Sequence, residues 1–357
     1  MPLMAKKLKV LYLTKYTRKG ASSRLRSYQY FPYLETQGIV IKVSPLFDGQ
    51  YLENLYTKKS VLKQIIKAYI RRFFVLGKVF KYDKVVIEKE LFPYLPTWIE
   101  HSLKKLNIQY IVDYDDAIFH NYDKNRNSIV HFFLKHKIDK VMKYSQYVIV
   151  GNSYLKEKAV SSGVKNIQII PTVIDLNRYS VKDKCNEGNI VIGWIGTNST
   201  IKYVKKIVPV LEKLIANYNV RIHIVGAGES LELGENEIHI KWSEDSEVQS
   251  ILTFDIGIMP LDDGDWEKGK CGYKLIQYMA CAIPVVASAV GANKDIVEHG
   301  LNGFLVSEFN DWYTYMEQYI QNAALRKQHG QQGRFLVENK YCVQKQLNQY
   351  INVFKSV

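Results

Sequence analysis

Several kinds of sequence feature are scarce or missing in this chain of 357 residues. No run approaches the roughly 20 apolar residues that cross a bilayer, and Met1–Lys9 lacks an apolar stretch of signal-peptide length. The cysteines have neither paired nor zinc-binding spacing, which is typical of reduced cytosolic thiols; they are Cys185, Cys271, Cys281 and Cys342. HExxH, GxSxG and Walker patterns are also missing. We therefore expect a cytoplasmic protein outside those three enzyme classes.

Acidic residues are scarce in the first half of the chain. Residues 1–185 contain 33 Lys and Arg but 15 Asp and Glu, whereas residues 186–357 contain 16 and 20. The net charge of +14 is therefore concentrated in one half, which favours an anionic partner such as a phosphorylated substrate or an acidic membrane. Because no base-stacking motif accompanies the charge, we expect no nucleic-acid partner.

Short apolar segments alternate with longer, helix-like segments in both halves. In the first half the expected strands are Val10–Thr14, Val40–Leu46, Lys84–Ile87, Gln109–Asp113 and Tyr147–Gly151. In the second half they are Asn189–Ile195, Val220–Val225, Asp255–Met259 and Pro284–Ala287. This alternation predicts an α/β protein with two parallel sheets and crossover helices. The polar stretch Asp183–Gly188, where the charge balance changes, is the expected domain boundary.

The loop after the first expected strand combines a tight turn with positive charge. Gly20 permits close backbone approach, and Ser22 or Ser23 is suited to cap the following helix. A helix start attracts phosphate, and Arg24 adds charge there, so Gly20, Ser23 and Arg24 are candidate acceptor or phosphate ligands. An ordinary turn with a solvated basic face explains the same residues.

Three aspartates, Asp113, Asp115 and Asp116, directly follow another expected strand. Their mutual repulsion has to be offset, which favours a function such as a general base or a ligand of sugar hydroxyls. Divalent cations also prefer carboxylate ligands, and a capped helix start would explain the cluster without any function. Asp115 and Asp116 are the candidate catalytic residues, and the sequence does not decide between them.

The most specific pattern lies in residues 262–306. Two lysines and two glycines surround the start of an expected helix, where backbone donors, helix dipole and ammonium groups together favour an anion. Gln277, on the next turn, offers an amide to hydroxyl groups. The candidate donor-binding residues here are Lys270, Cys271, Gly272, Tyr273, Lys274 and Gln277. The alternative is a surface helix with two exposed lysines.

Two other segments have a functional and a purely structural interpretation. Gly196 and Thr197 end an expected strand, and their N–H groups would suit a diphosphate as well as an ordinary turn. Thr57–Tyr82 contains eight Lys and Arg and no acid, with apolar residues at helical spacing. This segment is typical of a basic amphipathic helix on an anionic bilayer, but also of a core-packing helix with a solvated face.

One stretch resembles a known family. The segments 278–288, 296–300 and 302–306, together with Gly291 between the first two, are similar to glycosyltransferase family 4. The order of weaker motifs, Asp113–Phe119 among them, resembles a bacterial branch that makes surface polysaccharides. The resemblance implies a GT-B fold, with two Rossmann-like domains facing across a cleft, and retaining transfer from a nucleotide-diphosphate sugar.

The resemblance also assigns positions in this chain. The family's two glutamates correspond to Gly269 and Gln277, and Gln277 keeps a group for ribose hydroxyls. Lys270 or Lys274 would then supply the donor contact that Gly269 lacks. The family's Arg–Lys diphosphate clamp corresponds to Thr197 and Lys202, and the His-Asp pair of its N-terminal domain to Asp115-Asp116.

Together these features predict an acceptor domain at 1–180, a nucleotide-sugar domain at 186–335 and, from the resemblance, a segment 336–357 whose helix returns to the first domain. The expected reaction moves a sugar from a UDP- or GDP-type donor to a hydroxyl of a glycan or lipid-linked acceptor in polysaccharide biosynthesis. Positive groups would stabilise the leaving diphosphate, so no cofactor or metal is expected. The expected location is the cytoplasm, including the inner face of the cell membrane.

Two alternatives remain. Asp113 and Asp115 match the metal-binding DxD of a GT-A transferase, although that fold leaves the repeated sheet unexplained. A catalytically silent GT-B-like scaffold would account for the replaced glutamates.

Overall fold

The computed structural model describes residues 7–57, 59–182 and 188–356, and the chain divides into two compact units. The first unit is Met1–Thr172 with Gln346–Val357, and the second is Val173–Lys345. The predicted boundary Asp183–Gly188 lies outside the described residues except for Gly188.

The segment that follows Thr172 belongs to the second unit because its side chains pack there. Ile174 and Tyr179 are buried in the same apolar cluster as Val337. The Val343 N–H also donates to the Ile174 carbonyl oxygen at 2.9 Å. The division into units therefore differs from the predicted bounds at 180, 186 and 336.

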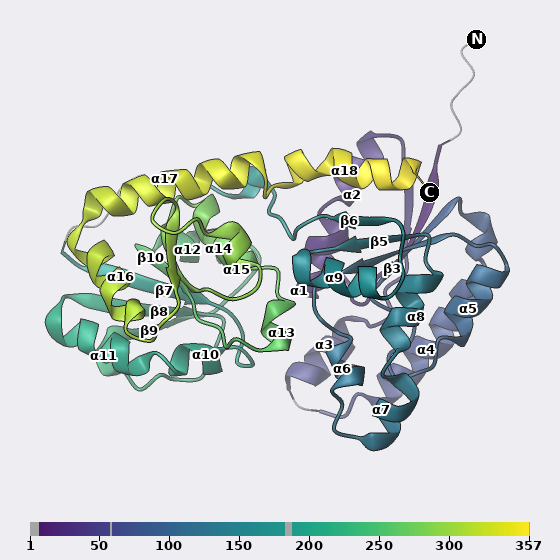
Figure 1. The fold of residues 1–357 in the computed structure, drawn as a ribbon, viewed down its shortest axis with the longest axis horizontal. Coiled ribbons are helices and arrows are strands. Elements are labelled where there is room, and N and C mark those ends of the chain that lie inside the picture. The colour runs from purple at the N-terminus through teal and green to yellow at the C-terminus, as the bar shows by residue number, and fades with distance from the viewer. Residues whose placement is uncertain (1–6, 58, 183–187, 357) are drawn as a thin grey trace, which may run out of the picture. The chain divides into compact units, whose positions relative to one another are not determined.

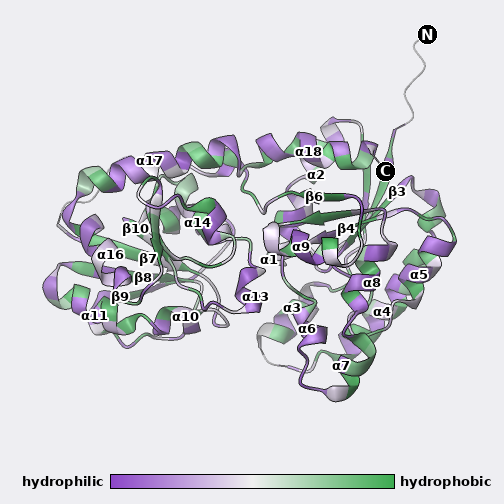
Figure 2. Cartoon of the chain, viewed as in Figure 1, coloured by the Kyte–Doolittle hydropathy of each residue, from purple (hydrophilic) through white to green (hydrophobic). Residues whose placement is uncertain are grey.

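A six-stranded parallel sheet forms the centre of the first unit (Figure 1). Its strands are β1 (Lys9–Leu13), β2 (Val40–Val43), β3 (Lys84–Glu88), β4 (Tyr110–Tyr114), β5 (Tyr147–Val150) and β6 (Ile167–Ile169). They lie in the order β2-β1-β3-β4-β5-β6, and every neighbouring pair is parallel. The central strand β4 is buried along its whole length, as expected of a parallel strand covered on both faces. Figure 2 shows hydrophobic stretches in the strands of this sheet.

Helices and helical turns connect these strands. They are α1 (Ala21–Ser23), a π-helix at Arg24–Tyr28, α2 (Phe31–Thr36), α3 (Gly49–Tyr56), α4 (Leu62–Leu76), a 3-10 turn at Val79–Lys81, α5 (Trp98–Lys105), α6 (His120–Asp123), α7 (Ser128–Leu134), α8 (Lys137–Tyr144) and α9 (Ser153–Ser161). The final helix is α18 (Val343–Lys355), and its residues from Gln346 onwards belong to this unit. Tyr350 of α18 stacks on Tyr30 with ring centroids 4.7 Å apart.

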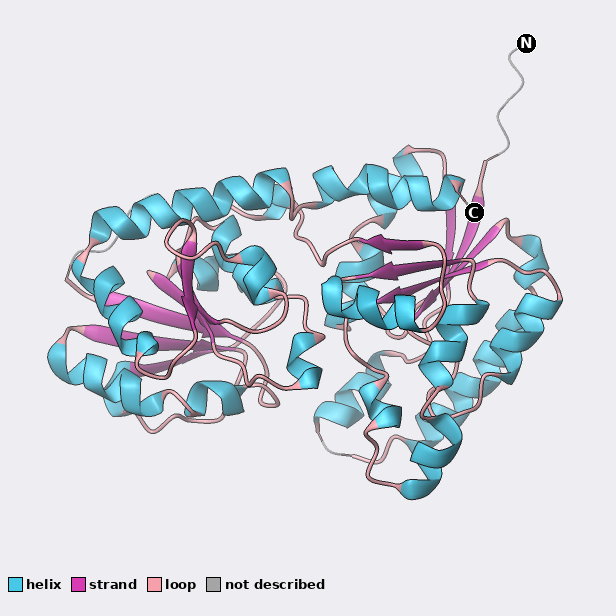
Figure 3. Cartoon of the chain, viewed as in Figure 1, coloured by secondary structure: helices cyan, strands magenta, loops and turns pink. Residues whose placement is uncertain are grey.

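The second unit repeats this plan with a different strand order. Its strands are β7 (Ile190–Ile195), β8 (Val220–Val225), β9 (Glu237–Ile240), β10 (Ile256–Met259), β11 (Val285–Ser288) and β12 (Gly303–Val306). They form a parallel sheet in the order β12-β11-β10-β7-β8-β9. Figure 3 shows helices on both sides of this sheet. The two unit sheets are of the doubly wound type that the sequence predicts.

The helices of the second unit begin after the 3-10 turn Leu176–Arg178. They are α10 (Ile201–Lys205), α11 (Val208–Asn217), α12 (Glu247–Leu252), α13 (Asp265–Lys268), α14 (Tyr273–Ala280), α15 (Asn293–Ile296), α16 (Asp311–Gln321) and α17 (Ala323–Asn339), with a further 3-10 turn at Gly234–Asn236. Across the part of the chain that the structure describes, no helix combines the length and apolar character needed to cross a membrane.

Candidate functional site

The chain leaves β7 and β10 in opposite directions across the sheet of the second unit. β7 continues to its neighbour β8 on one side, whereas β10, on its other side, continues to β11. Ligands in such sheets bind outside the carboxyl ends of the strands at the point where the strand order reverses. Gly196 directly follows β7, and the loop from Pro260 to Gly272 follows β10, so both predicted donor segments lie at this point.

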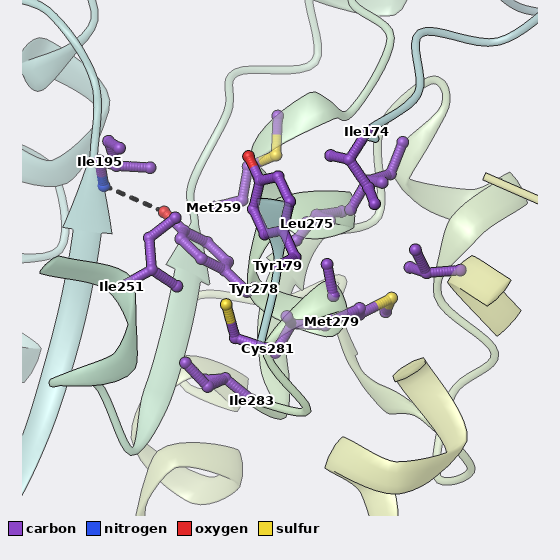
Figure 4. Close-up of a cluster of buried hydrophobic side chains, with 14 of the residues drawn as sticks. Ile174, Tyr179, Ile195, Ile251, Met259, Leu275, Tyr278, Met279, Cys281 and Ile283 are labelled. Carbon is purple, nitrogen blue, oxygen red and sulfur yellow. Dashed lines mark hydrogen bonds between the residues drawn. The ribbon is translucent and has the colours of Figure 1, made fainter. Parts of the chain in front are cut away.

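Helix α14 is fixed to the two central strands by Tyr278. The backbone N–H of Ile195 donates to the Tyr278 hydroxyl oxygen at 3.0 Å, as Figure 4 shows. The ring packs on Gly257, where an added Cβ would lie 2.4 Å from Tyr278 Cδ2. Tyr278 is fully buried in the apolar cluster of this unit. These contacts hold α14 against the carboxyl end of β7.

Gly272 begins α14 in a conformation that favours glycine. Its φ is +63°, and a Cβ there would lie 2.3 Å from Ile296 Cδ1. Glycine adopts this left-handed backbone conformation without a steric cost, and the neighbouring Cys271 is buried. The expected glycine-dependent helix start is therefore present in the structure.

Lys274 places its ammonium group beside the turn that follows β7. Nζ lies 4.1 Å from the centre of the Trp194 ring, and a Cβ on Gly196 would be 2.7 Å from the same nitrogen. Burial, together with the neighbouring charge of Lys270, lowers the pKa of Lys274 to about 7. The structure thus brings Gly196 and Lys274 together, although they are distant in sequence.

Gln277 is buried and takes part in an internal hydrogen-bond network. Its Nε2 donates to the Tyr179 hydroxyl at 3.2 Å, and that hydroxyl donates to Glu247 Oε1 at 2.8 Å. Trp242 Nε1 donates to the other oxygen of Glu247 at 2.9 Å, and the Tyr273 hydroxyl lies 3.5 Å from that of Tyr179. The sequence identified Gln277 and Tyr273 as candidates, but it offered no motif for the other members of the network, which are Tyr179, Glu247 and Trp242.

Two glycine turns pack against each other at the ends of β7 and β8. A Cβ on Gly226 would lie 2.6 Å from the Gly196 carbonyl oxygen, and the Gly228 N–H donates to Asn198 Oδ1 at 2.9 Å. The Thr197 N–H donates to Thr200 Oγ1 at 3.2 Å, which closes the turn. Thr197 itself is exposed.

Lys202 lies one turn further on, in α10, and is also exposed. Its Nζ is 4.8 Å from the ring centre of Tyr203. The Tyr203 hydroxyl donates to the buried Glu267 carboxylate, which joins α10 to α13 in the loop after β10. Glu267 is a second acidic residue that the sequence analysis did not single out.

The predicted residues of the first unit lie at its own strand-order reversal, where β1 and β3 are neighbours. Gly20 precedes α1, and a Cβ there would lie 2.4 Å from Tyr16 Cβ. Ser23 is buried, accepts from the Tyr16 N–H at 2.9 Å and donates to Glu88 Oε2 at 2.7 Å. Arg24 is buried as well. The alternative interpretation of this loop, a turn with a solvated basic face, therefore does not hold for Ser23 and Arg24, because neither side chain is exposed to solvent.

Asp113 forms a buried ion pair with Arg26. Arg26 Nη2 lies 2.6 Å from Asp113 Oδ1, and Nε lies 3.1 Å from Oδ2. Arg26 Nη1 also donates to the Ile170 carbonyl oxygen at 2.7 Å. Both carboxylate oxygens of Asp113 are therefore engaged by the guanidinium, which joins the start of the unit to β4 and to the segment after β6.

Asp115 is held by two other residues. Lys89 Nζ lies 2.8 Å from Asp115 Oδ1, and Ser22 Oγ donates to Oδ2 at 2.6 Å. Burial raises the pKa of Asp115, but the charges of Lys89 and Arg26 outweigh it and lower the pKa to about 2. Such a carboxylate is ionised at neutral pH and takes up a proton poorly, which favours hydrogen-bond acceptance over general-base catalysis. Asp116 is more exposed than Asp115, and its Oδ2 lies 3.7 Å from Lys89 Nζ.

Lys89 and Glu88 were not identified from the sequence. Lys89 has a φ of +67°, which is strained for a side chain other than glycine, and its N–H donates to the Asp113 carbonyl oxygen at 2.9 Å. Although burial opposes the charge of Lys89, Asp115 and Asp116 raise its pKa. Glu88 accepts from the Lys15 N–H at 2.8 Å, and burial raises the pKa of Glu88.

The chemistry available differs between the units. The second unit offers an ammonium group and a helix N-terminus to an anion; the first offers hydrogen-bonding carboxylates to a hydroxyl. Within residues 7–57, 59–182 and 188–356, no three His, Cys, Asp or Glu side chains are grouped so as to hold a metal ion.

One protein-family model matches most of the second unit. Residues 189–322 match the family model described as Glycosyl transferases group 1. The second unit carries a glycosyltransferase domain. A curated relative, the N-acetyl-alpha-D-glucosaminyl L-malate synthase of Bacillus anthracis, is 24% identical over 213 residues. That match covers 54% of this chain and 54% of the relative, so it spans about half the length of each.

Solved structures with the same fold cover nearly the whole chain. The HepE protein of Anabaena, crystallised with UDP and glucose, has a TM-score of 0.71 and 15% identity over 98% of this chain and 100% of that chain. Sucrose-phosphate synthase from Thermosynechococcus elongatus has a TM-score of 0.72 and 12% identity over 98% and 100%. The fold is therefore GT-B, which confirms the predicted fold class. The GT-A alternative is wrong, and its proposed metal ligand Asp113 is paired with Arg26.

Proposed function

We propose that this protein is a glycosyltransferase that takes a sugar from a UDP- or GDP-type donor and transfers it to a hydroxyl of a glycan or lipid-linked acceptor. The observation that carries the proposal is the position of Lys274 Nζ against Gly196 at the strand-order reversal of the second unit. A diphosphate at this point would meet an ammonium group and the N-terminus of α14 together. Membership of family 4 and retention of the anomeric configuration are part of this proposal, supported by the motifs at 278–306.

The proposed chemistry depends on the charge that develops on the leaving diphosphate. Lys274 and the N–H groups at the start of α14 are fixed before the substrate arrives, so they stabilise that charge without reorganisation. Because the pKa of Lys274 is about 7, part of the amine is neutral near neutral pH, and a bound diphosphate would favour the ammonium form by uptake of a proton from solvent. Lys270, Thr197 and Lys202 are proposed as further donor contacts, and no metal or other cofactor is part of the proposal.

In the first unit we propose that Asp115 and Asp116 orient the acceptor hydroxyl. Lys89 holds Asp115 ionised and in one position, so its carboxylate is a stable hydrogen-bond acceptor. Gly20 keeps the adjoining loop close to Tyr16 and so positions Ser22, which donates to the same carboxylate. In this proposal Ser23 and Arg24 do not bind phosphate. As buried residues they support the loop that carries Ser22.

Calorimetry with UDP, GDP and their sugar conjugates tests the proposal. We expect one of the two diphosphates to bind, and Lys274→Ala to weaken its binding by about tenfold or more, as for loss of a charge-assisted contact. Lys213→Ala is a suitable control, because Lys213 contacts Tyr313 on α16. If no nucleotide diphosphate or nucleotide sugar binds the wild-type protein, the proposal is wrong.

A catalytically silent GT-B scaffold remains a second candidate. One observation favours it: Gly269 offers no side chain where the family places a donor-contacting glutamate, and Gln277 is engaged by Tyr179. Donor binding without transfer or hydrolysis of the sugar would support the silent scaffold. Release of UDP or GDP that depends on added acceptor would support the enzyme.

We also propose that Thr57–Tyr82 contacts an anionic membrane, which would place the protein at the inner face of the cell membrane. The buried face of α4, with Ala68, Arg72 and Leu76, packs on the unit. A separate apolar stripe on the same helix is exposed; it consists of Leu62, Ile66, Ile70, Phe73 and Phe74. A core-packing helix with a merely basic outer face does not explain this second apolar stripe.

Three bases border the exposed stripe of α4. Lys63, Lys67 and Arg71 follow one another at every fourth position and line a pocket of about 110 Å³ that Tyr51 of α3 also lines. This arrangement suits lipid phosphates beside inserted apolar side chains. Ile66→Gln with Ile70→Gln should reduce sedimentation with anionic vesicles, whereas Val160→Gln, an exposed residue of α9, should not.

A further inference from the structure

Helix α7 exposes an apolar face at the surface of the first unit. Ile129, Phe132 and Phe133 are 69%, 72% and 70% exposed, whereas Leu134 is buried. The three exposed residues stand at positions i, i+3 and i+4, so they share one face of the helix. The rings of the two phenylalanines also contact each other, with centroids 5.1 Å apart. A surface helix that packs on a core normally turns such residues inward.

Positive charge surrounds this face. Residues 124–143 contain six Lys and Arg and a single acid, Asp139. The exposed bases are Lys124, Arg126, Lys135, Lys140 and Lys143. Asp139 is itself paired with Lys158 at 2.5 Å and with His136 at 3.1 Å. The residues that flank the apolar face of α7 in the sequence are therefore predominantly basic, and the one acid among them, Asp139, is paired.

We propose that α7 is a membrane-insertion site, in which Phe132 and Phe133 enter the interfacial layer of an anionic bilayer. Aromatic rings favour that layer, and flanking Lys and Arg side chains are attracted to its acidic headgroups. With seven residues, α7 is far too short to span a bilayer, so it lies at the surface. The site is distinct in sequence from the α4 stripe, and Figure 1 draws both helices in the lower part of the first unit.

The charge and the size of the face favour a bilayer over a second copy of this chain. A stable protein interface buries on the order of 800 Å² on each partner, more than three side chains of a two-turn helix offer. Two copies would also bring the same bases together, and that repulsion opposes pairing. A bilayer of acidic lipids satisfies both the rings and the charges.

Sedimentation of the full chain with vesicles of phosphatidylcholine and phosphatidylglycerol in equal parts tests the inference. The double variant Phe132→Ser/Phe133→Ser should lower the vesicle affinity by about tenfold or more, because two aromatic side chains lose their apolar environment. Phe335→Ser is the matched control: Phe335 is 64% exposed on α17 of the acidic second unit, and its loss should leave the affinity unchanged.

A second variant keeps the inference testable if the double variant folds poorly. In Phe132→Trp, the fluorescence of the new tryptophan should shift to shorter wavelength with anionic vesicles but not with pure phosphatidylcholine. An unchanged affinity of the double variant, an equal loss in Phe335→Ser, or no spectral shift would overturn the inference. So would a dimer that the double variant converts to a monomer.

The result for α7 can be distinguished from the results for the α4 membrane proposal and the donor-binding proposal. Vesicle binding lost with the α4 variant but kept with the α7 variant supports α4 alone and rejects the α7 site. Nucleotide binding is measured without vesicles, so failure of the donor proposal leaves the membrane result unaffected.

Discussion

Lys274 Nζ lies 4.1 Å from the centre of the Trp194 ring and directly against Gly196. Trp194 is on β7 and Lys274 on α14, so the contact exists because Tyr278 holds that helix against the strand. The proposed diphosphate site depends on the position of this amine and not only on the presence of lysines in the loop.

Donor binding should take up a proton in alkaline solution. The pKa of Lys274 is about 7 without ligand, and a bound diphosphate should raise it. At a pH of about 8.5 binding should therefore take up close to one proton, but at about 6 the amine is already charged and uptake should be near zero. Calorimetry in buffers of different ionisation enthalpy measures this number. Lys274→Arg, which stays charged, should show no uptake; an unchanged uptake in that variant contradicts the assignment.

Gly196→Ala should weaken donor binding because its Cβ would lie 2.7 Å from Lys274 Nζ and 2.4 Å from Trp194 Cζ2. We expect the unfolding free energy to fall by about 1–3 kcal/mol from overpacking, and the affinity for the diphosphate to fall with it. Gly228→Ala on the neighbouring turn is the control, since nothing lies within 4 Å of the Cβ that it would add. Equal affinities of the two variants would show that the Gly196 contact is unimportant.

Lys89→Met should destabilise the first unit by about 3–5 kcal/mol at neutral pH, because it leaves the Asp115 carboxylate buried without its main partner. Without Lys89, burial should raise the pKa of Asp115 above its unfolded value, so the folded variant binds the extra proton. The difference in stability from the wild type should therefore shrink as pH falls from about 7 to 5.

Urea unfolding at both pH values measures this pH dependence. Asp115→Asn added to Lys89→Met should recover part of the loss at neutral pH, since it removes the unpaired charge. A loss that is independent of pH and of Asp115 would indicate that the strained backbone at Lys89, and not the ion pair, dominates.

Tyr278→Phe should lower the unfolding free energy by about 1–3 kcal/mol, because it leaves the buried Ile195 N–H without its acceptor. The ring remains to fill the space beside Gly257, so the fold should persist. Thermal unfolding and hydrogen exchange at Ile195 check the result. Unchanged exchange protection at that amide would contradict the anchoring role that we give to Tyr278.

The strands in which apolar residues predominate were mostly predictable. β8 was predicted with the bounds that it has, and β3 and β4 within one residue at each end. β6, β9 and β12 were missed: β6 has three residues, β9 alternates polar and apolar side chains, and β12 begins with Gly303. All three lie at the edge of a sheet, where the apolar pattern that identifies a central strand is shorter or weaker.

The candidate site was only partly predictable. Gly272 and Lys274 were identified because glycine and charge at a helix start are local features. Lys89 was missed because its role depends on a left-handed bend and on Asp115, which follows the neighbouring strand β4. Glu247 was missed for a related reason, since it accepts from Tyr179 only after the segment at 173–182 packs into the second unit.

The amino-acid sequence by itself determined the α/β alternation, the charge asymmetry and the glycine-lysine helix start, because each depends on neighbours along the chain. Only the tertiary structure decided which polar groups are internal. Ser23 and Gln277, which the sequence offered as ligands, are buried and bonded to Glu88 and Tyr179. Burial and hydrogen-bond satisfaction depend on residues that are distant in sequence, and desolvation by those residues also sets the pKa of Lys274.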